Sequence, residues 1–259
     1  MIGREGSFDE GLTRIQRLYV RFLGAPEIGA RIRHRITMAH VLDAGFSRLL
    51  DAGCGKAYSL FWMARQYPHG DFTGLEGDAV TVKRNRNIKE HMGLTNIHFH
   101  RHDLLKEFSG DRFDLILSVD VLEHIEDDGL VLQRLARSLK PEGKLIVHVP
   151  AAQRKYFFKS SYDYVVPDHV REGYGSGELE RKLEKSGFRV TEARKGYNFF
   201  ETLANEIGTF LSKHLWLYAL ALPFLDLLSR VPQPLADAVR PVRNSLLFVA
   251  EVRENESGP

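Results

Sequence analysis

The chain has 259 residues, of which 43% are hydrophobic and 27% are charged, and its 36 Lys and Arg against 34 Asp and Glu leave a net charge of +2. These values exclude disorder over the bulk of the chain, because the apolar content is high and the net charge is small. The single cysteine, Cys54, excludes an internal disulfide and a multi-thiolate zinc site. The N-terminal residues lack the apolar core of a secretory signal, so we expect a cytoplasmic protein.

The first 46 residues are helical in pattern and rich in arginine. Apolar residues recur at helical spacing over residues 10–44, with a break near residues 24–26, which predicts two helices. From Arg14 to Arg35 the chain has one acid, Glu27, and six arginines: Arg14, Arg17, Arg21, Arg31, Arg33 and Arg35. Such a stripe is either a solvated helix face or a phosphate-binding patch.

From residue 47 onward, short strands alternate with helices. The predicted strands cover residues 47–52, 71–76, 97–101, 113–119, 144–149, 188–194 and 246–252. One predicted helix covers residues 58–66, and a second runs from the end of the second strand to about residue 91. Two more cover residues 129–139 and 176–187, the last with Ser176 as its cap. This alternation is typical of crossover units and predicts an α/β fold with a mostly parallel, twisted sheet.

A long apolar stretch at residues 199–243 interrupts this alternation before the last strand. Its densest part, residues 215–228, is too short to span a bilayer and contains Pro223 and Asp226. Three interpretations are open: the stretch caps the active site, forms a dimer interface, or lies in a membrane surface through residues 214–231. The sequence therefore predicts a helical cap at 1–46, a core at 47–198 plus 244–254, and this apolar helical insertion.

The most informative residues end the first three predicted strands. Asp51 ends the first strand and precedes Gly53 and Gly55, in a turn before a helix. Glycines let the backbone approach a ligand closely, and the start of a helix favours an anionic or acceptor group. Glu76 ends the second strand, where a carboxylate can accept from both hydroxyls of a ribose, and Asp103 ends the third. Ligands of open α/β sheets bind at this edge.

Five motifs occur in order: D-A-G-C-G at 51–55, Glu76, H-D-L-L at 102–105, F-D-L-I-L-S-V-D-V-L-E-H-I at 113–125 and L-K-P-E-G-K-L-I-V-H-V-P at 139–150. Over roughly residues 31–195 the chain resembles the class I S-adenosylmethionine-dependent methyltransferases. This resemblance implies a Rossmann-like sheet of seven strands whose last strand is antiparallel, with S-adenosylmethionine as the cofactor. A nicotinamide dehydrogenase is disfavoured, because the chain lacks the third glycine of G-x-G-x-x-G.

The resemblance assigns eight residues to the cofactor: Asp51, Gly53, Gly55, Glu76, Gly77, Asp103, Leu104 and Val119. It implies that the first aspartate and the two turn glycines surround the methionine end and that the glutamate holds the ribose. Asp103 and Leu104 would face the adenine, and Val119 would line the pocket. Ala57 stands where the family often has a third glycine, so we expect a slightly shifted turn. Arg35 is a candidate partner for the carboxylate of the methionine end.

The methyl group of a sulfonium is transferred by in-line displacement, so a base is needed only for a weakly acidic acceptor such as a hydroxyl. His124, just beyond the fourth strand, is the candidate base, because imidazole titrates near neutral pH. The alternative is a structural histidine bonded to loop backbone. His169, in D-H-V-R at 168–171, is the second candidate, since relatives place a similar loop near the acceptor. His148, on an apolar strand, is predicted to be a satisfied core residue.

Several chemistries are excluded. Cytosine-C5 methylation needs a cysteine nucleophile, and the one thiol lies in the glycine turn. Adenine amino-methylation uses Asn/Asp-Pro-Pro-Tyr after the fourth strand, where this chain has S-V-D-V. The sequence has no zinc-ligand spacing, and His98, His100 and His102 alternate on a strand without a cysteine partner. No metal site is therefore predicted.

The acceptor should be recognised by segments outside the common sheet. The loop at 151–176 carries aromatic residues that either close over an apolar acceptor or pack on the sheet: Tyr156, Phe157, Phe158, Tyr162, Tyr164 and Tyr174. We predict methyl transfer to oxygen of a small, apolar or lipid-linked acceptor, by a protein that is cytoplasmic or peripheral at the inner membrane face. The alternatives are RNA methylation along the arginine stripe, although nucleic acid is a disfavoured partner, and a non-catalytic cofactor-binding module.

Overall fold

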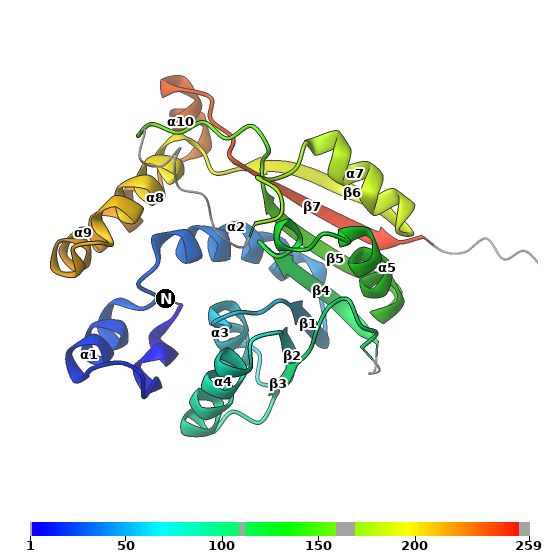
Figure 1. The fold of residues 1–259 in the computed structure, drawn as a ribbon, viewed down its shortest axis with the longest axis horizontal. Helices are drawn as coiled ribbons and strands as arrows, with labels where there is room; N and C mark the ends of the chain where they lie inside the picture. The colour runs from blue at the N-terminus through cyan, green and yellow to red at the C-terminus, as the bar shows by residue number, and fades with distance from the viewer. Residues whose placement is uncertain (1, 109–111, 159–168, 254–259) are drawn as a thin grey trace, which may run out of the picture.

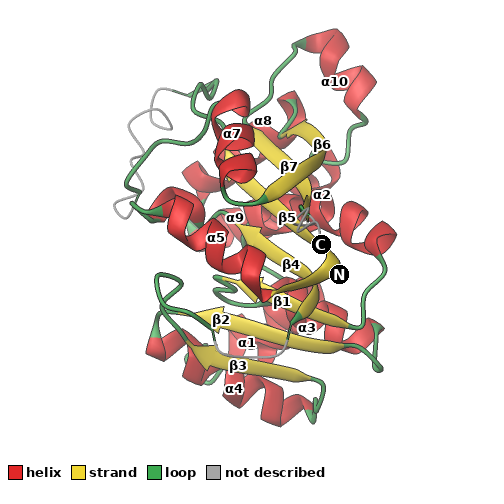
Figure 2. Ribbon diagram, turned by 90° about the vertical axis from the view of Figure 1, so that its right-hand side faces the viewer, coloured by secondary structure: helices red, strands yellow, loops and turns green. Residues whose placement is uncertain are grey.

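A computed structural model describes residues 2–108, 112–158 and 169–253. Its centre is a seven-stranded sheet with the order β3-β2-β1-β4-β5-β7-β6 (Figures 1 and 2). The strands are β1 Arg48–Ala52, β2 Asp71–Glu76, β3 Ile97–Arg101, β4 Phe113–Val119, β5 Leu139–Pro150, β6 Phe188–Gly196 and β7 Ser245–Val252. β7 runs antiparallel to β5 and β6, whereas the other neighbouring pairs are parallel. The predicted α/β sheet with an antiparallel last strand is confirmed.

Helices cover both faces of this sheet (Figure 1). They are η1 Arg4–Phe8, α1 Arg14–Leu23, α2 Ile28–Ala44, α3 Tyr58–Gln66, α4 Ala79–Met92, η2 Leu122–His124, α5 Asp128–Ser138, α7 Ser176–Lys185, α8 Phe199–Leu211, α9 Leu215–Leu228 and α10 Gln233–Val239. Apolar side chains of α5 and α7 pack on one face, and those of α2, α3 and α4 pack on the other. Because both faces are buried, the central strands are mostly apolar.

Hydrogen bonds at the helix ends explain the observed boundaries. Thr13 accepts from the third backbone N–H of α1, which completes a capping box. Asp127 accepts from the backbone N–H of Leu130 at 3.0 Å, so α5 starts one residue earlier than predicted. The expected cap of α7 is wrong, because Gly175 is the N-cap and Ser176 is the first helical residue.

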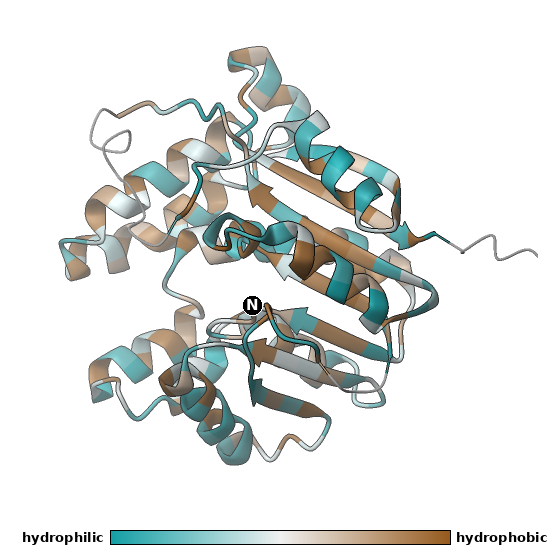
Figure 3. Ribbon diagram, turned by 45° about the vertical axis from the view of Figure 1, so that its right-hand side comes forward, coloured by the Kyte–Doolittle hydropathy of each residue, from teal (hydrophilic) through white to brown (hydrophobic). Residues whose placement is uncertain are grey.

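The apolar insertion forms the three helices α8, α9 and α10, of which α8 and α9 pack against α2 (Figure 3). A third apolar cluster joins these elements: Ile28, Ile32, Tyr197, Ala204, Tyr218, Leu222 and Leu225. The Tyr218 hydroxyl donates to the carbonyl of Pro26 at 2.5 Å and accepts from the N–H of Ile28 at 3.0 Å. One side of α9 is thus fixed to the start of α2. The division of the chain into three parts stays a prediction.

Within the described part of the chain, every helix by itself is too short or too polar to cross a bilayer. Only α9 and α10 taken together have the length and composition, and they are bent by 99° relative to each other.

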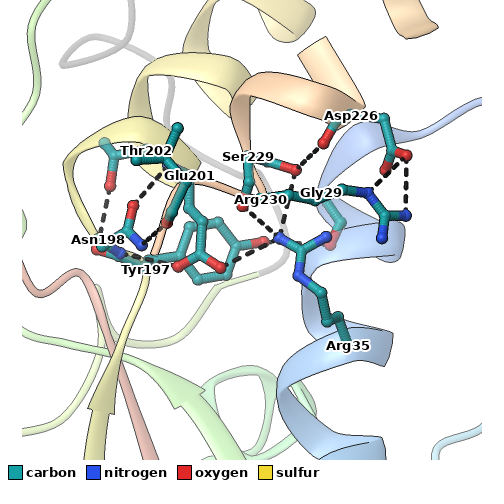
Figure 4. Close-up of polar contacts among 10 residues, drawn as sticks. Gly29, Arg35, Tyr197, Asn198, Glu201, Thr202, Asp226, Ser229 and Arg230 are labelled. Carbon is teal, nitrogen blue, oxygen red and sulfur yellow. Dashed lines mark hydrogen bonds and ion pairs between the residues drawn. The ribbon is translucent and has the colours of Figure 1, made fainter. Parts of the chain in front are cut away.

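The six N-terminal arginines separate into two groups. Three lie on α1: Arg14, Arg17 and Arg21. The other three are engaged inside the fold: Arg31 with carbonyls before α2, Arg33 with Asp120, and Arg35 with Glu201 and Ser229 (Figure 4). Arg35 donates to the Ser229 carbonyl at 2.6 Å and to Glu201 at 3.1 Å, so it is directed toward the end of α9 and the start of α8. The role at the cofactor that the sequence suggested for Arg35 stays a prediction.

We expect Tyr218→Phe to lower the free energy of unfolding by about 1–3 kcal/mol, because it leaves the buried N–H of Ile28 and carbonyl of Pro26 without their partner. Chemical denaturation measures the change. Tyr67→Phe, at a more exposed ring, is the matched control and should alter stability by less than about 0.5 kcal/mol. Equal effects at the two positions would contradict this role of Tyr218.

Candidate active site

The turn after β1 is held against the end of β2 by backbone hydrogen bonds. The N–H groups of Gly53 and Cys54 both donate to the carbonyl of Leu75 at 2.9 Å. Gly53 has φ of +87°, and a Cβ at this position would lie 2.5 Å from a methyl group of Val121. Gly55 has φ of +48°, and a Cβ there would meet nothing within 4 Å. The turn therefore needs glycine at Gly53 for close packing and leaves an open space beside Gly55.

Ala57 completes this turn in the left-handed conformation, with φ of 57° and ψ of 27°, and is the N-cap of α3. A non-glycine residue in this region carries a cost of roughly 1–2 kcal/mol. Its methyl group is buried in the apolar cluster beneath α3, which offsets part of that cost. The alanine thus adopts the backbone conformation that a glycine would favour.

Two carboxyl groups lie at the ends of β1 and β2, as predicted. Glu76 accepts from the N–H of Gly55 at 3.0 Å and from the N–H of Asp78 at 2.9 Å, so it fixes the glycine turn directly. Asp51 is 7% exposed, and burial, together with the charge of Glu76, raises its pKa to about 7. Ionised Asp51 is therefore unfavourable until a cation or a hydrogen-bond donor comes close.

The residues predicted to contact adenine follow β3, beside the end of β2. The Asp103 carboxylate is exposed and accepts from the N–H of Leu105 at 2.9 Å, which closes the turn after β3. Leu104 packs partly against the apolar core, and the carbonyl of Gly77 accepts from Arg101 at 3.3 Å. Val119, the last residue of β4, is half-buried and packs against the apolar cluster under α3. All four residues lie at the predicted edge, and their contacts with cofactor stay predictions.

Asp120, directly after β4, is the centre of a network that sequence reasoning missed. It has φ of 51°, bonds Nδ1 of His148 at 2.6 Å and pairs with Arg33 at 3.2 Å. Burial raises the pKa of Asp120, but the charges of His148 and Arg33 outweigh burial and hold this pKa at about 2. The expectation that His148 is a satisfied core residue is half right: it is buried, but its Nε2 has no partner among the described residues.

His124 and His169, predicted separately, come together with Glu123. The two rings meet edge to face with centroids 4.4 Å apart, and one ligand atom of each of the three residues lies within 4.8 Å of the others. Glu123 is 1% exposed, and burial, followed by the charge of Asp120, raises its pKa to about 8. Two imidazoles and a carboxyl group are donors that a divalent cation accepts. The expectation of no metal site did not anticipate this group and stays a prediction.

Asp128, at the start of α5, ties the His169 loop to the η2 loop. It is buried and accepts from Arg171 at 2.6 Å, from Lys182 at 2.7 Å and from the hydroxyl of Tyr174 at 2.7 Å. Arg171 also donates to the carbonyls of Ile125 and Glu126, just after His124. The predicted D-H-V-R motif thus supplies a histidine and the arginine that positions it.

A small cavity of about 120 Å³ lies beside the Asp120 network and is lined by residues of α2, β5 and α8. Its charged and polar lining includes Arg33, Asp120, His148, Arg154, Asn205 and Glu206. Of the six aromatic loop residues, Tyr156 lines the cavity, Phe157 packs on Phe199, and Tyr174 is buried in the core. Phe158 is exposed, and Tyr162 and Tyr164 lie outside the described residues. The described part of the loop therefore packs within the fold and lines the cavity, whereas its closing over an apolar acceptor stays a prediction.

A family model described as a methyltransferase domain matches residues 46–187. Trans-aconitate 2-methyltransferase of Deinococcus radiodurans is 30% identical over 117 residues, which are 45% of this chain and 43% of that protein. The ubiquinone biosynthesis O-methyltransferase of Xanthomonas oryzae pv. oryzae is 31% identical over 106 residues, or 41% of this chain and 44% of that protein. These matches span less than half the length of the curated relatives.

The fold is also similar to that of a solved methyltransferase structure. The N-methyltransferase NodS of Bradyrhizobium japonicum WM9, solved with S-adenosyl-L-homocysteine, aligns with a TM-score of 0.56 at 16% identity, over 87% of this chain and 88% of that one. Because the family model covers more than half of the sequence, the chain belongs to the class I S-adenosylmethionine-dependent methyltransferases. The open space beside Gly55 and the carboxyl groups of Asp51 and Glu76 fit that cofactor.

Glu76→Ala should weaken S-adenosylmethionine binding by about 1–3 kcal/mol, because ribose hydroxyls and the N–H of Gly55 lose their acceptor. Isothermal titration calorimetry measures the affinity, and a thermal melt checks folding. Glu90→Ala, at an exposed residue of α4, is the control and should bind the cofactor as the wild type does. Wild-type affinity in Glu76→Ala would show that this carboxylate does not hold the ribose.

Cofactor affinity should increase as the pH rises from about 5.5 to about 7.5, by up to tenfold per pH unit below the pKa of Asp51. The sign follows from the raised pKa: Asp51 is largely protonated below pH 7, and a cationic cofactor binds its ionised form better. Calorimetry across this range, with Asp51→Asn as the comparison, measures the slope. The same slope in Asp51→Asn would rule out Asp51 as its source.

Proposed function

We propose that the protein transfers the methyl group of S-adenosylmethionine to a hydroxyl group of a small, apolar or lipid-linked acceptor. The observation that carries this proposal is the group Glu123, His124 and His169 at the carboxyl end of β4. A hydroxyl must lose its proton as the bond to the methyl forms, and neutral imidazole is suited to accept it near pH 7. One relative is named an O-methyltransferase, which also supports oxygen as the acceptor atom.

The bound cofactor supplies a methyl group already activated on a sulfonium. In this proposal, Asp51 faces the methionine end, the glycine turn accommodates it by close backbone approach, and Glu76 accepts from the ribose hydroxyls. Asp103 with Leu104 faces the adenine, and Val119 lines the space between cofactor and acceptor. These groups orient the cofactor, so that the reaction depends on the alignment of the acceptor oxygen.

His124 takes the proton from the acceptor hydroxyl. Its ring is exposed toward the space beyond β4, and the edge-to-face contact with His169 restricts its orientation. The buried carboxyl group of Glu123 precedes it, and the Glu123 carbonyl accepts from the N–H of Val170 at 3.0 Å, next to His169. This hydrogen bond holds the loop of His124 against the loop of His169, so that the two imidazole rings stay in contact.

The acceptor is proposed to be apolar over most of its length with a polar reacting end. The cavity next to Asp120 provides polar partners, including the Nε2 of His148, which has no hydrogen-bond partner among the described residues, and the carboxylate of Glu206. Beyond it, α8 and α9 present apolar side chains, and residues 214–231 are proposed to contact a membrane surface from which such an acceptor would come. RNA is a weaker candidate, because three of the six arginines of the stripe are engaged inside the fold.

His124→Ala should lower turnover by roughly a hundredfold or more and leave cofactor affinity unchanged, because it removes the proton acceptor but no predicted cofactor contact. His98→Ala, a change of an exposed histidine on β3, is the matched control. Turnover and S-adenosylmethionine affinity are measured for both variants. Full activity in His124→Ala would remove this histidine from the mechanism.

The acceptor itself is tested with radiolabelled S-adenosylmethionine against lipid, saccharide and RNA fractions. The proposal expects label in an organic-soluble product that carries a methyl ether. Label in RNA, or strong RNA binding that weakens with salt, would replace the proposal by RNA methylation. Cofactor binding without transfer to any fraction would favour a non-catalytic binding module.

A further inference from the structure

Two helices expose rows of large apolar side chains. On α1, Ile15, Leu18 and Phe22 follow one another at helical spacing and are 57–64% exposed. On α9, the side chains at the same kind of spacing are 56–72% exposed: Leu217, Leu220, Phe224 and Leu227, with Trp216 beside them. Rows of this size are unusual on a surface that meets only water, and they mark a contact site.

The two rows lie on the same side of the molecule. The Tyr19 hydroxyl of α1 donates to the carbonyl of Ala219 in α9 at 3.4 Å, and Tyr19 packs against the cluster that includes Tyr218 and Leu222. Figures 1 and 3 show α1 and α9 side by side, away from the strands and from α5 and α7. We call the exposed residues Ile15, Leu18, Phe22, Trp216, Leu217, Leu220, Phe224 and Leu227 the apolar face.

A basic groove adjoins this face. It has a volume of about 850 Å³ between η1, α1 and the ends of α3 and α4, and Leu18 and Phe22 of the apolar face form part of its wall. Its arginines are Arg4, Arg14, Arg17, Arg21 and Arg65. Among the described residues, no ion pair involves any of these arginines. Burial raises the pKa of Glu5, the carboxyl group in the groove, to about 7, so at neutral pH it is only partly ionised and offsets less than one of the five positive charges.

A second copy of the chain is a poor occupant for this surface. In a two-fold dimer the same patch contacts itself, so Arg14, Arg17 and Arg21 of both copies would approach one another. Like charges brought together out of water repel strongly. An occupant that is apolar inside and negatively charged at its surface satisfies both parts of the patch at once.

We propose that the apolar face and the basic groove form a docking site for an anionic phospholipid bilayer. The apolar side chains enter the boundary between headgroups and acyl chains, and the groove arginines bind headgroup phosphates. Guanidinium groups suit this role because they make paired hydrogen bonds to phosphate oxygens. The sequence suggested membrane contact for residues 214–231 only; the structure adds α1 and the groove.

This site lies close to the proposed acceptor cavity and deepens the proposed function, on which its role in catalysis rests. α9 packs along α8, and α8 supplies Thr202, Asn205 and Glu206 to the cavity wall. Docking through α9 would therefore bring the cavity toward the bilayer surface. The reacting end of a lipid-linked acceptor would then enter the cavity while its apolar part stays in the membrane.

The test is flotation of the full chain with vesicles of phosphatidylcholine containing about one-third phosphatidylglycerol, compared with vesicles of phosphatidylcholine alone. We expect binding to the anionic vesicles that weakens as salt increases. Arg14→Gln with Arg21→Gln should weaken it about twenty-fivefold, at roughly a factor of five per charge. Trp216→Ser with Leu220→Ser should abolish it.

Matched controls come from other parts of the surface. Arg181→Gln changes an exposed arginine of α7, and Leu235→Ser changes a leucine of α10 that is 60% exposed. Both should float as the wild type does. Cofactor affinity and thermal melting confirm that every variant is folded, since the changed residues touch neither the glycine turn nor the histidines.

Absence of binding to anionic vesicles, or equal binding to both vesicle types, would overturn the proposal. So would a dimer in sedimentation equilibrium that Trp216→Ser with Leu220→Ser converts to monomer, because the face would then be a subunit interface. Vesicle binding is measured without any acceptor, so it is independent of the proposed reaction. Transfer to detergent-dispersed lipid without vesicle binding would refute docking alone, and vesicle binding without transfer to lipid would refute only the acceptor class.

Discussion

The close contact between the turn after β1 and the end of β2 is the constraint on which the cofactor end of the molecule depends. Two backbone N–H groups of the turn share the carbonyl of Leu75, and a third, that of Gly55, bonds the carboxylate of Glu76. No side chain larger than hydrogen fits at Gly53, because Val121 from the end of β4 occupies the adjacent space. Three neighbouring strand ends are thereby fixed together, and the buried carboxyl of Asp51 lies among them at a raised pKa.

The loops after β4 and before α7, where we propose that the acceptor binds, are held in place by charged side chains rather than by backbone packing. Asp128 gathers Arg171, Lys182 and the hydroxyl of Tyr174, so the loop that carries His169 is held against the loop that carries His124. Asp120 does the same for His148 and Arg33. Buried carboxylates need such partners, because a lone ion in the interior is costly. The interactions that stabilise these carboxylates also place His124, His148 and His169 around one end of the sheet.

The helices between β6 and β7 connect this interior to the surface. Tyr218 and Arg35 join them to α2 through hydrogen bonds, whereas the side chains on the opposite side of α9 are largely exposed. An apolar helix in a protein of this size is commonly buried on all sides. Here burial is one-sided, which is the reason for our proposal that the exposed row of α9, with that of α1, docks on a membrane.

The sequence by itself determined the order of strands and helices, the residues at the strand ends and the family, because these depend on local periodicity and on short motifs. It placed Asp51, Glu76 and Asp103 at one edge, since parallel strands end on the same side. It did not determine that Glu123, His124 and His169 meet or that His148 pairs with Asp120. Nor did it determine that Arg31, Arg33 and Arg35 bond partners from other segments of the fold while Arg14 and Arg21 are exposed. Only the tertiary structure decided these, because each contact joins segments far apart in the chain whose separation is set by packing and by the pairing of buried charges.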